Sequence, residues 1–224
     1  VAQTGESEAG SPQRKGAVLA AITALKQICN HPVNYQDDGA ELDGRSGKLA
    51  RLNEILEVVF AADEKMLIFT HFATWGDRLA EYLTARTGKR IECYHGGLGR
   101  GARDRMVDTF QESDGAGAMV LSLKAGGTGL NLTRATHVVH YDRWWNPAVE
   151  DQASDRAWRI GQDRAVQVHR LVCEGTVEDR IAALLASKRD LADRVVGGGE
   201  AWVSVLDVDA RTELVALSAG EGAR

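Results

Sequence analysis

The chain has 224 residues, 44% of them hydrophobic, and a formal net charge of −5. This length allows one large domain or two small ones with a substantial core, and no apolar run is long enough to span a membrane. The acidic balance argues against a dedicated nucleic-acid binder, although the basic segment 86–105 is compatible with either a local phosphate-binding patch or a solvated helix face.

The first part of the sequence predicts a disordered lead and then two helices. Residues 1–15 are polar without an apolar period, so we expect a lead or linker there, and Val in place of Met at the first position favours a piece of a longer protein. Residues 16–32 have helical periodicity that stops at an Asn-His-Pro breaker. A loop is expected at 34–47, and residues 48–62 form an amphipathic helix.

From residue 66 onward, short apolar strands alternate with helices. Strands are predicted at 66–72, 90–95, 118–124, 136–142 and 166–173. Helices are predicted at 75–86, at 101–112, after the Gly-rich turn that follows residue 124, from Pro147 to just before Gly161, and at 176–196. This alternation predicts an α/β fold with a parallel sheet, helices on both faces, and ligands at the carboxyl ends of the strands. After a triple-glycine break, the pattern favours a short strand at 202–206 and a helix near 210–218.

Cysteine and histidine spacing predicts neither a disulfide framework nor a metal site. Cys29, Cys93 and Cys173 are odd in number and widely spaced, which indicates a reducing compartment. His137 and His140 are three residues apart in a predicted strand, so they should point to opposite faces of the sheet. We therefore expect no bound metal.

The standard nucleotide-binding fingerprints are absent from the sequence. Neither Gly-Lys pair, at 47–48 or 88–89, has a glycine five positions earlier, so neither forms a Walker A loop. The segment 97–102 (GLGRGA) resembles a dinucleotide loop, but the acidic residue expected about twenty positions later is missing. Asp142 ends an apolar strand as a Walker B aspartate does; without a phosphate-binding lysine loop it is more typical of a strand-end or turn aspartate.

Two other motifs allow both a functional and a structural interpretation. The Gly-rich turn within LSLKAGGTGLNL (121–132) lets backbone N–H groups approach an anion, with Lys124 adding charge, or it is simply a tight turn that needs glycine. Trp144 and Trp145 follow a strand, and buried core is the usual place for tryptophan. Two in tandem cannot both point inward, so we expect one to be exposed, where it could stack on a base.

A possible phosphate site comes from the segment DQASDRAWRIGQ (151–162). Gln152, Arg156 and Arg159 stand at positions i, i+4 and i+7, which is one stripe of a helix. In the structural interpretation, Asp151 and Asp155 pair with these arginines on a solvated face. In the functional one, two guanidinium groups meet a phosphate, because the arginine fork is planar, always charged and bidentate.

The ordered set of motifs resembles the second RecA-like lobe of Swi/Snf-type ATPases, within the superfamily-two helicase fold. The resemblance covers roughly residues 16–196, and its segments are QICNHP (27–32), SGKL (46–49), LIFTHF (67–72), YHGGLGRGARDRMVDTF (94–110), LSLKAGGTGLNLTRATHVVHYDRWWNP (121–147), QASDRAWRIGQ (152–162) and GTVEDRI (175–181). It implies a three-layer RecA-like sandwich with a mostly parallel sheet. The Ala-, Gly- and Arg-rich composition is compatible with a bacterial source.

The resemblance also implies roles at the nucleotide. Arg156 and Arg159 match the motif VI arginines, which reach across a cleft to the γ-phosphate of ATP as arginine fingers do. Gln152 begins the same motif. Motif V, which lies near both nucleotide and DNA, is matched by Gly127, Thr128 and Gly129.

Further positions match DNA-contacting residues of the family. Lys124 falls where relatives place a basic or polar residue on the DNA backbone, and Trp145 matches a tryptophan held against DNA. Thr70, His71 and Arg103 match phosphate contacts to the tracking strand, although many relatives have Gln at the position of His71. The predicted helix at 176–196 resembles the brace that runs back towards the first lobe.

The family's first lobe, which carries the Walker A loop and the DEx[HQ] box, is missing from the sequence. The resemblance therefore implies half of a motor: a lead at 1–15, a helicase C-terminal lobe at 16–196 and a tail at 197–224. ATP with Mg²⁺ would be held mainly by the missing lobe, so the chain alone should be inactive and bind no cofactor tightly. We expect Arg156 and Arg159 to be solvent-exposed at the carboxyl edge of the sheet, paired loosely with Asp residues or a stray anion.

The partners implied by the resemblance are double-stranded DNA, the missing N-terminal lobe, and a protein such as RNA polymerase or a nucleoprotein complex, but no membrane. The location would be the cytoplasm at the nucleoid in a bacterium, or the nucleus in a eukaryote. Two alternatives remain open: a catalytically idle DNA-binding or docking module that has kept the fold, and a lobe of a strand-separating helicase.

Overall fold

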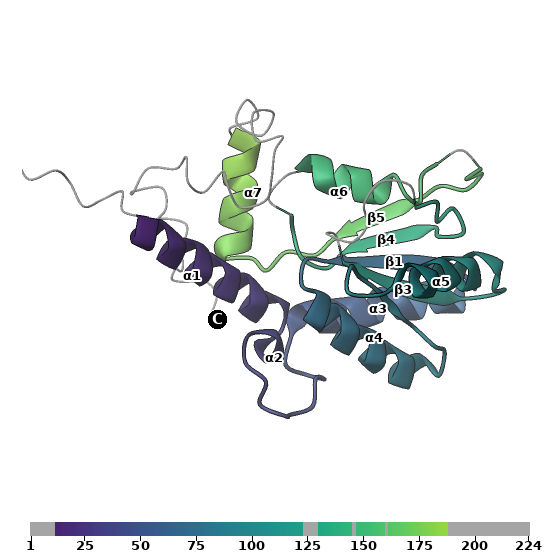
Figure 1. The fold of residues 1–224 in the computed structure, drawn as a ribbon, viewed down its shortest axis with the longest axis horizontal. Helices are drawn as coiled ribbons and strands as arrows, with labels where there is room; N and C mark the ends of the chain where they lie inside the picture. The colour runs from purple at the N-terminus through teal and green to yellow at the C-terminus, as the bar shows by residue number, and fades with distance from the viewer. Residues whose placement is uncertain (1–11, 123–129, 145–146, 160, 188–224) are drawn as a thin grey trace, which may run out of the picture.

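The computed structural model describes residues 12–122, 130–144, 147–159 and 161–187 (Figure 1). The strands, in chain order, are β1 (Lys65–Thr70), β2 (Cys93–Tyr94), β3 (Gly117–Ser122), β4 (His137–His140) and β5 (Gln167–Arg170). The helices are α1 (Pro12–Asn30), α2 (Pro32–Tyr35), α3 (Gly47–Ala61), α4 (Ala73–Thr87), α5 (Arg100–Glu112), α6 (Pro147–Ser154) and α7 (Val177–Ser187). The predicted alternation of strands and helices is confirmed except between β3 and β4, where the described residues 130–136 contain no helix although a short one was predicted after the Gly-rich turn.

The five strands form one parallel sheet in the order β2-β3-β1-β4-β5. The central strand β1 is buried along its whole length, which explains why its sequence is apolar on both faces instead of alternating. Phe69 pairs with Leu121 on one side and with His140 on the other. The strands β1, β3 and β4 therefore end together, and their carboxyl ends form one edge of the sheet.

Helices cover both faces of the sheet and enclose two hydrophobic clusters. Successive residues of β1 point to opposite faces. Met66 and Ile68 pack with residues of α3 and α4, whereas Leu67 and Phe69 pack with residues of α5 and α6. Full burial of one such side chain contributes about 1.5–3 kcal/mol, so the central strand is a main source of stability for both layers.

The helices α1 and α7 contact each other near the carboxyl ends of the strands (Figure 1). α1 ends at Asn30, and the ring of His31 then caps the short helix α2 by accepting a hydrogen bond from the N–H of Val33. Ser46 caps α3 in the same way, since its hydroxyl accepts from the N–H of Leu49. That hydroxyl also donates to the carbonyl of Asn30 at 2.7 Å, so the start of α3 is fixed against the end of α1.

The helix after Pro147 is shorter than predicted. α6 ends at Ser154, and the residues up to Gly161 form turns within the part of the chain that is described. The carbonyl of Arg156 accepts a hydrogen bond from the N–H of Leu132 at 3.0 Å. A contact from a distant segment therefore takes a backbone group that a longer helix would have used.

Other boundaries differ by a few residues. α1 begins at Pro12, so the lead predicted at 1–15 is too long at its end; proline is favoured in the first turn of a helix because its missing N–H is not needed there. The strands β2 and β5, at the edges of the sheet, are shorter than the predicted 90–95 and 166–173. Short edge strands expose fewer unpaired backbone groups.

Several predicted features lie outside the described residues. These are most of the lead, the Gly-rich turn, the second half of the helix predicted at 176–196, the triple-glycine break, and the strand and helix predicted in the tail. The helices within the described ranges include none that is both long and apolar enough to cross a membrane.

Candidate functional site

One buried carboxylate, that of Asp142, joins the carboxyl ends of β1 and β4. It is fully buried and accepts hydrogen bonds from the hydroxyl of Thr70 at 2.6 Å and from the side-chain amide of Asn30 at 2.9 Å. The backbone N–H of His71 lies 2.9 and 3.1 Å from its two oxygens. The carboxylate is thus surrounded by donors, which compensates for its removal from water.

Thr70, predicted to contact phosphate, lies inside this arrangement. Its side chain is fully buried, its hydroxyl donates to Asp142, and the same oxygen accepts from the N–H of Phe72 at 3.3 Å. A hydroxyl in this position does not reach a phosphate at the surface. The predicted contact through this side chain is therefore corrected: Thr70 supports the backbone that follows it.

His71 and Trp144 meet directly after the ends of β1 and β4. Their ring centroids are 4.4 Å apart, and the ring of Phe72 packs edge-on against His71 at 5.0 Å. His71 is half-buried, whereas Trp144 is only 7% exposed and packs into the cluster under α5 and α6. Trp144 thus points into the core, and Trp145 lies outside the described residues.

The tryptophan segment is held by a second buried carboxylate. Glu150 of α6 is 1% exposed and accepts from the backbone N–H of Trp144 at 2.7 Å and from the side chain of Arg143 at 2.8 Å. Arg170 of β5 also pairs with it at 3.4 Å. Glu150 has no distinctive sequence signal, because a lone acidic residue in the first turn of a helix is common.

The predicted arginine fingers occupy different environments. Arg159 is exposed and donates to the carbonyl of Leu130 at 3.3 Å, while Arg156 is half-buried, so the expectation that both are solvent-exposed is wrong for Arg156. Burial lowers the pKa of Arg156 from its usual value, and the neighbouring charge of Arg159 acts in the same direction. Asp151, one of the expected carboxylate partners, pairs instead with Arg170 at 3.3 Å.

Arg103 lies close to the same region. Its guanidinium lies over the ring of Tyr94, 5.9 Å from the centroid. Tyr94 is also close enough to Arg156 to raise the pKa of that arginine, against the larger effect of burial. Tyr94 is the last residue of β2 and is 6% exposed. The structure thus gathers Arg103, Arg156 and Arg159 near the carboxyl end of β2, where positive charge favours an anion.

The other predicted site residues are only partly described. Gln152 is exposed on α6. The predicted motif V and DNA-backbone positions, Lys124, Gly127, Thr128 and Gly129, lie outside the described residues. Their sequence positions, between Ser122 at the end of β3 and Leu130 beside Arg159, remain the basis for their predicted roles.

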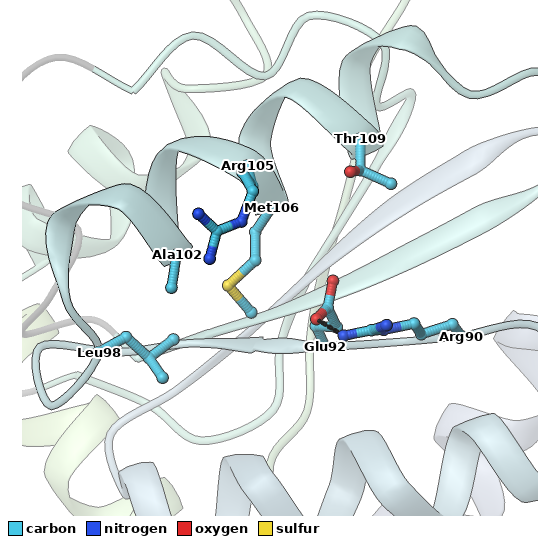
Figure 2. Close-up of a pocket in the computed structure, with 7 residues that line it drawn as sticks. All are labelled: Arg90, Glu92, Leu98, Ala102, Arg105, Met106 and Thr109. Atoms are coloured by element: carbon cyan, nitrogen blue, oxygen red, sulfur yellow. Dashed lines mark hydrogen bonds and ion pairs between the residues drawn. The ribbon is translucent and has the colours of Figure 1, made fainter.

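A cavity of about 370 Å³ lies beside the edge strand, between α5 and the segment that leads into β2 (Figure 2). Its lining is mixed, with an exposed ion pair between Arg90 and Glu92 at 2.5 Å on one side. The remaining lining residues are Leu98, Ala102, Arg105, Met106 and Thr109. None of the predicted site residues lines this cavity, so we assign it no part in the site.

A chain of buried polar groups links Asp142 to α7 through Asn30, Lys48 and Glu178, for which no role was predicted from the sequence. Asn30 receives a hydrogen bond from Lys48 at 3.3 Å, and Lys48 forms an ion pair with Glu178 at 2.6 Å. All three side chains are less than 5% exposed. The sequence signal that could have identified these residues is their place in the motifs QICNHP, SGKL and GTVEDRI.

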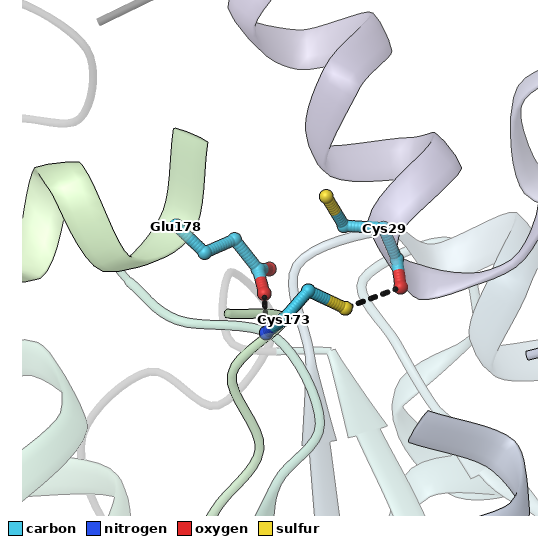
Figure 3. Close-up of side chains that lie close together, drawn as sticks. All are labelled: Cys29, Cys173 and Glu178. Carbon is cyan, nitrogen blue, oxygen red and sulfur yellow. Dashed lines mark hydrogen bonds between the residues drawn. The ribbon is translucent and has the colours of Figure 1, made fainter. Parts of the chain in front are cut away.

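Two cysteines lie beside this chain of polar groups (Figure 3). The Cys29 thiol, the Cys173 thiol and the Glu178 carboxylate have ligand atoms within 4.8 Å of one another, which is a spacing that a metal ion could use. However, Glu178 already binds Lys48 and accepts from the N–H of Cys173 at 3.0 Å. A buried ammonium group on the carboxylate opposes a cation, so we assign no metal here.

The chain is similar to known helicase-type domains. Residues 47–161 match the family described as Helicase conserved C-terminal domain. The structure is similar to the C-terminal domain of the Sulfolobus solfataricus SWI2/SNF2 ATPase, with a TM-score of 0.77 and 35% identity over 93% of this chain and 85% of that one. It is also similar to the ATPase core from that organism in complex with double-stranded DNA, with a TM-score of 0.80 and 37% identity over 93% and 43% of the two chains. The predicted RecA-like lobe is confirmed.

Longer relatives are found among curated proteins. YwqA of Bacillus subtilis (strain 168), provisionally named an ATP-dependent helicase/translocase, is 44% identical over 92% of this chain and 22% of its own length. The chromatin-remodeling ATPase INO80 of Cryptococcus neoformans (serotype D, strain B-3501A) is 39% identical over 77% of this chain and 10% of its own. The chain thus spans less than a quarter of either relative.

Proposed function

Because the chain belongs to the family of helicase conserved C-terminal domains, in its SWI2/SNF2 branch, we propose that it is the second motor lobe of an ATP-driven translocase on double-stranded DNA. In this proposal Arg156 and Arg159 act on the nucleotide, and the segments after β1, β3 and β4 contact the DNA backbone. One relative is named an ATP-dependent helicase/translocase and another an ATPase, and one neighbouring structure contains double-stranded DNA.

The observation that carries the nucleotide part is the group of three arginines near the carboxyl end of β2. Burial disfavours the charged form of Arg156, and the charge of Arg159 adds to this. An arriving phosphate would relieve both effects, because opposite charges attract more strongly away from water. Such guanidinium groups can stabilise the charge that develops on a transferring phosphoryl group.

ATP and Mg²⁺ would be held mainly by a first lobe with a Walker A loop, and that lobe would supply the phosphoryl chemistry. In the proposed mechanism this chain presents Arg156 and Arg159 across the cleft, bidentate to phosphate oxygens. Gln152 and the glycines of the predicted motif V would form the rest of this chain's side of the nucleotide cleft. Closure of the two lobes would bring the arginines to the nucleotide and shift the DNA-contacting segments at the same time.

The DNA part of the proposal uses positions near the ends of the strands. His71 is half-buried against Trp144, so its backbone and ring stand at the rim of the carboxyl edge. Lys124 and Trp145 are assigned by their positions in the motifs. We keep Arg103 as a phosphate contact, with the nucleotide side as its alternative, because it shares Tyr94 with Arg156.

The decisive experiment changes each finger in the protein with both lobes present. We expect Arg156→Ala and Arg159→Ala each to lower DNA-stimulated ATP turnover by at least about a hundredfold, since arginine fingers contribute roughly 10³–10⁵ in rate. Affinity for duplex DNA should stay within about twofold of the wild type. Arg164→Ala, which removes an exposed arginine paired with Glu64, is the matched control and should leave turnover unchanged.

The same variants separate the alternatives. Turnover that survives both changes would favour the catalytically idle docking module, because the fingers would then have no chemical role. Strand separation on a forked duplex would favour the helicase alternative. We expect translocation without strand separation, in keeping with the motif VI sequence DRAWRIGQ and the WWNP segment.

A further inference from the structure

We propose that Asp142 is the positioning residue for the turn formed by His71 and Phe72, and that Asn30 and Lys48 couple this turn to α7. The inference rests on the proposed DNA contact of that turn. In this inference the buried polar groups fix the backbone of His71 and Phe72, which is proposed to contact the DNA, and connect it to α7.

One carboxylate, that of Asp142, controls the turn. Both oxygens of Asp142 lie within hydrogen-bond distance of the N–H of His71, at 2.9 and 3.1 Å. The hydroxyl of Thr70 donates to Asp142 and accepts from the N–H of Phe72. The two backbone N–H groups that follow β1 are therefore oriented by the same side chain, one directly and one through Thr70.

The turn is also connected to α7. The amide of Asn30 bridges the two sides, because its nitrogen donates to Asp142 at 2.9 Å and its oxygen accepts from Lys48 at 3.3 Å. Lys48 then forms an ion pair with Glu178 at 2.6 Å. Glu178 also accepts a hydrogen bond, at 3.0 Å, from the backbone N–H of Cys173 in the loop before α7. An unbroken series of buried hydrogen bonds thus runs from the start of α7 to the end of β1.

The stability of the fold does not by itself require the buried polar residues of this series. Buried ion pairs are often replaced by apolar residues of similar volume with little or no loss of stability. A buried carboxylate with several donors instead enforces one geometry, since any displacement leaves polar groups without partners. Such enforcement suits a turn that must hold its backbone and the ring of His71 in place.

The test uses the whole ATPase and a charge-conserving exchange. Asp142→Asn puts an amide nitrogen among donors, so we expect the DNA concentration for half-maximal ATP turnover to rise about tenfold while kcat stays within twofold. The double variant Asn30→Asp/Asp142→Asn moves the carboxylate one position along the series, where Lys48 and the new amide donate to it. This variant should restore the DNA concentration to within about threefold of the wild type.

A second pair covers the case in which Asp142→Asn does not fold. Thr70→Val keeps the shape of the side chain but removes the hydroxyl between Asp142 and Phe72. It should raise the half-maximal DNA concentration several-fold, whereas Thr70→Ser, which keeps the hydroxyl, should match the wild type. Hydrogen–deuterium exchange, measured without DNA, should become faster at the amides of residues 71 and 72 in Asp142→Asn and at the amide of residue 72 in Thr70→Val, but not in Thr70→Ser.

The two proposals fail in different ways. A wild-type protein whose turnover does not respond to DNA contradicts the proposed function, while the exchange rates still report on the turn. Unchanged exchange at residue 72 in Thr70→Val, or a loss of kcat at unchanged DNA affinity in Asp142→Asn, overturns the positioning role. Failure of the double variant to restore DNA affinity overturns the coupling through Asn30.

Discussion

Asn30, the last residue of α1, makes four hydrogen bonds to residues from distant parts of the chain. Its carbonyl accepts from the hydroxyls of Ser46 at 2.7 Å and Tyr141 at 2.9 Å, and its side chain bridges Lys48 and Asp142. An asparagine suits this position because its amide offers both a donor and an acceptor. One residue therefore fixes the end of a helix, the start of another and the end of a strand.

At the same scale, the three cysteines differ in chemistry because their surroundings differ. The hydrogen bond from the Cys173 thiol lowers the pKa of Cys29, whereas burial raises the pKa of Cys93 to about 12. The thiolate is the nucleophile in alkylation. We expect the rate of Cys29 alkylation by iodoacetamide to rise at a lower pH than that of an ordinary thiol, with Cys93 unreactive while the protein is folded.

Peptide mapping by mass spectrometry, as a time course between pH 5.5 and 9, measures these rates. The control is Cys173→Ala, which removes the hydrogen bond and should move the Cys29 midpoint upward, towards the ordinary thiol pKa of 9.0. Equal alkylation rates for Cys29 and Cys93 at pH 7 would contradict the assignment.

Sequence reasoning reached some of these residues and missed others for a physical reason. The positions of Arg156, Arg159 and His71 follow from motifs of neighbouring residues. The hydrogen bond from the Cys173 thiol to the Cys29 carbonyl, and the role of Asn30, depend on how the end of α1 packs against the loop before α7. Contacts between such distant segments are decided by tertiary packing and have no periodic signature.

At the scale of elements, α7 is fastened to α3 by the buried ion pair of Lys48 and Glu178, with side chains 2% and 1% exposed. We expect Glu178→Ala to lower the free energy of unfolding by about 3–5 kcal/mol, because it leaves a buried ammonium group without its partner. Replacing both residues, as in Lys48→Met/Glu178→Met, should lower it by much less.

Urea denaturation followed by circular dichroism gives both values. The exposed pair of Arg51 and Glu54 in α3 supplies the comparison, since removing Glu54 should change stability by less than about 1 kcal/mol. A double variant less stable than Glu178→Ala would show that the ion pair itself, and not the unpaired charge, dominates.

The elements themselves were largely predictable. Strands and helices follow from apolar periodicity, and most boundaries fall within a few residues of those in the structure. The main error was the end of α6, where an amphipathic pattern continued beyond Ser154 but the Arg156 carbonyl was taken by Leu132. Periodicity describes one segment at a time and contains no information on such a competitor.

For the whole molecule, the main prediction concerns activity. We expect the isolated chain to show no ATP turnover above background, with or without duplex DNA, because the Walker A loop is absent from its sequence. It should bind duplex DNA weakly, and the affinity should fall at least tenfold between 50 and 200 mM salt, since phosphate contacts release counterions.

A phosphate-release assay and fluorescence anisotropy measure the two quantities. Addition of the first lobe should restore turnover, which provides the positive control. DNA-stimulated hydrolysis by the chain alone would contradict the proposal of a half-motor, and binding that does not respond to salt would contradict phosphate contact.

The net charge of −5 gives no information on how charge is distributed over the surface. Acidic residues dominate the total, yet Arg103, Arg156 and Arg159 are gathered near one edge of the sheet. A whole-chain charge averages over faces that are apart in space, whereas a ligand responds to the local field. The RecA-like fold and the family could be predicted; the local grouping of charge could not.

The strand order has a consequence for how the protein is made. β1 emerges from the ribosome first among the strands, but its two neighbours in the sheet, β3 and β4, both come later. Until His137 has been synthesised to pair with Met66, one edge of the most apolar strand stays open to other chains. The nascent chain is therefore most vulnerable to aggregation between the synthesis of β1 and that of β4, and a chaperone that binds extended apolar segments would act in that interval.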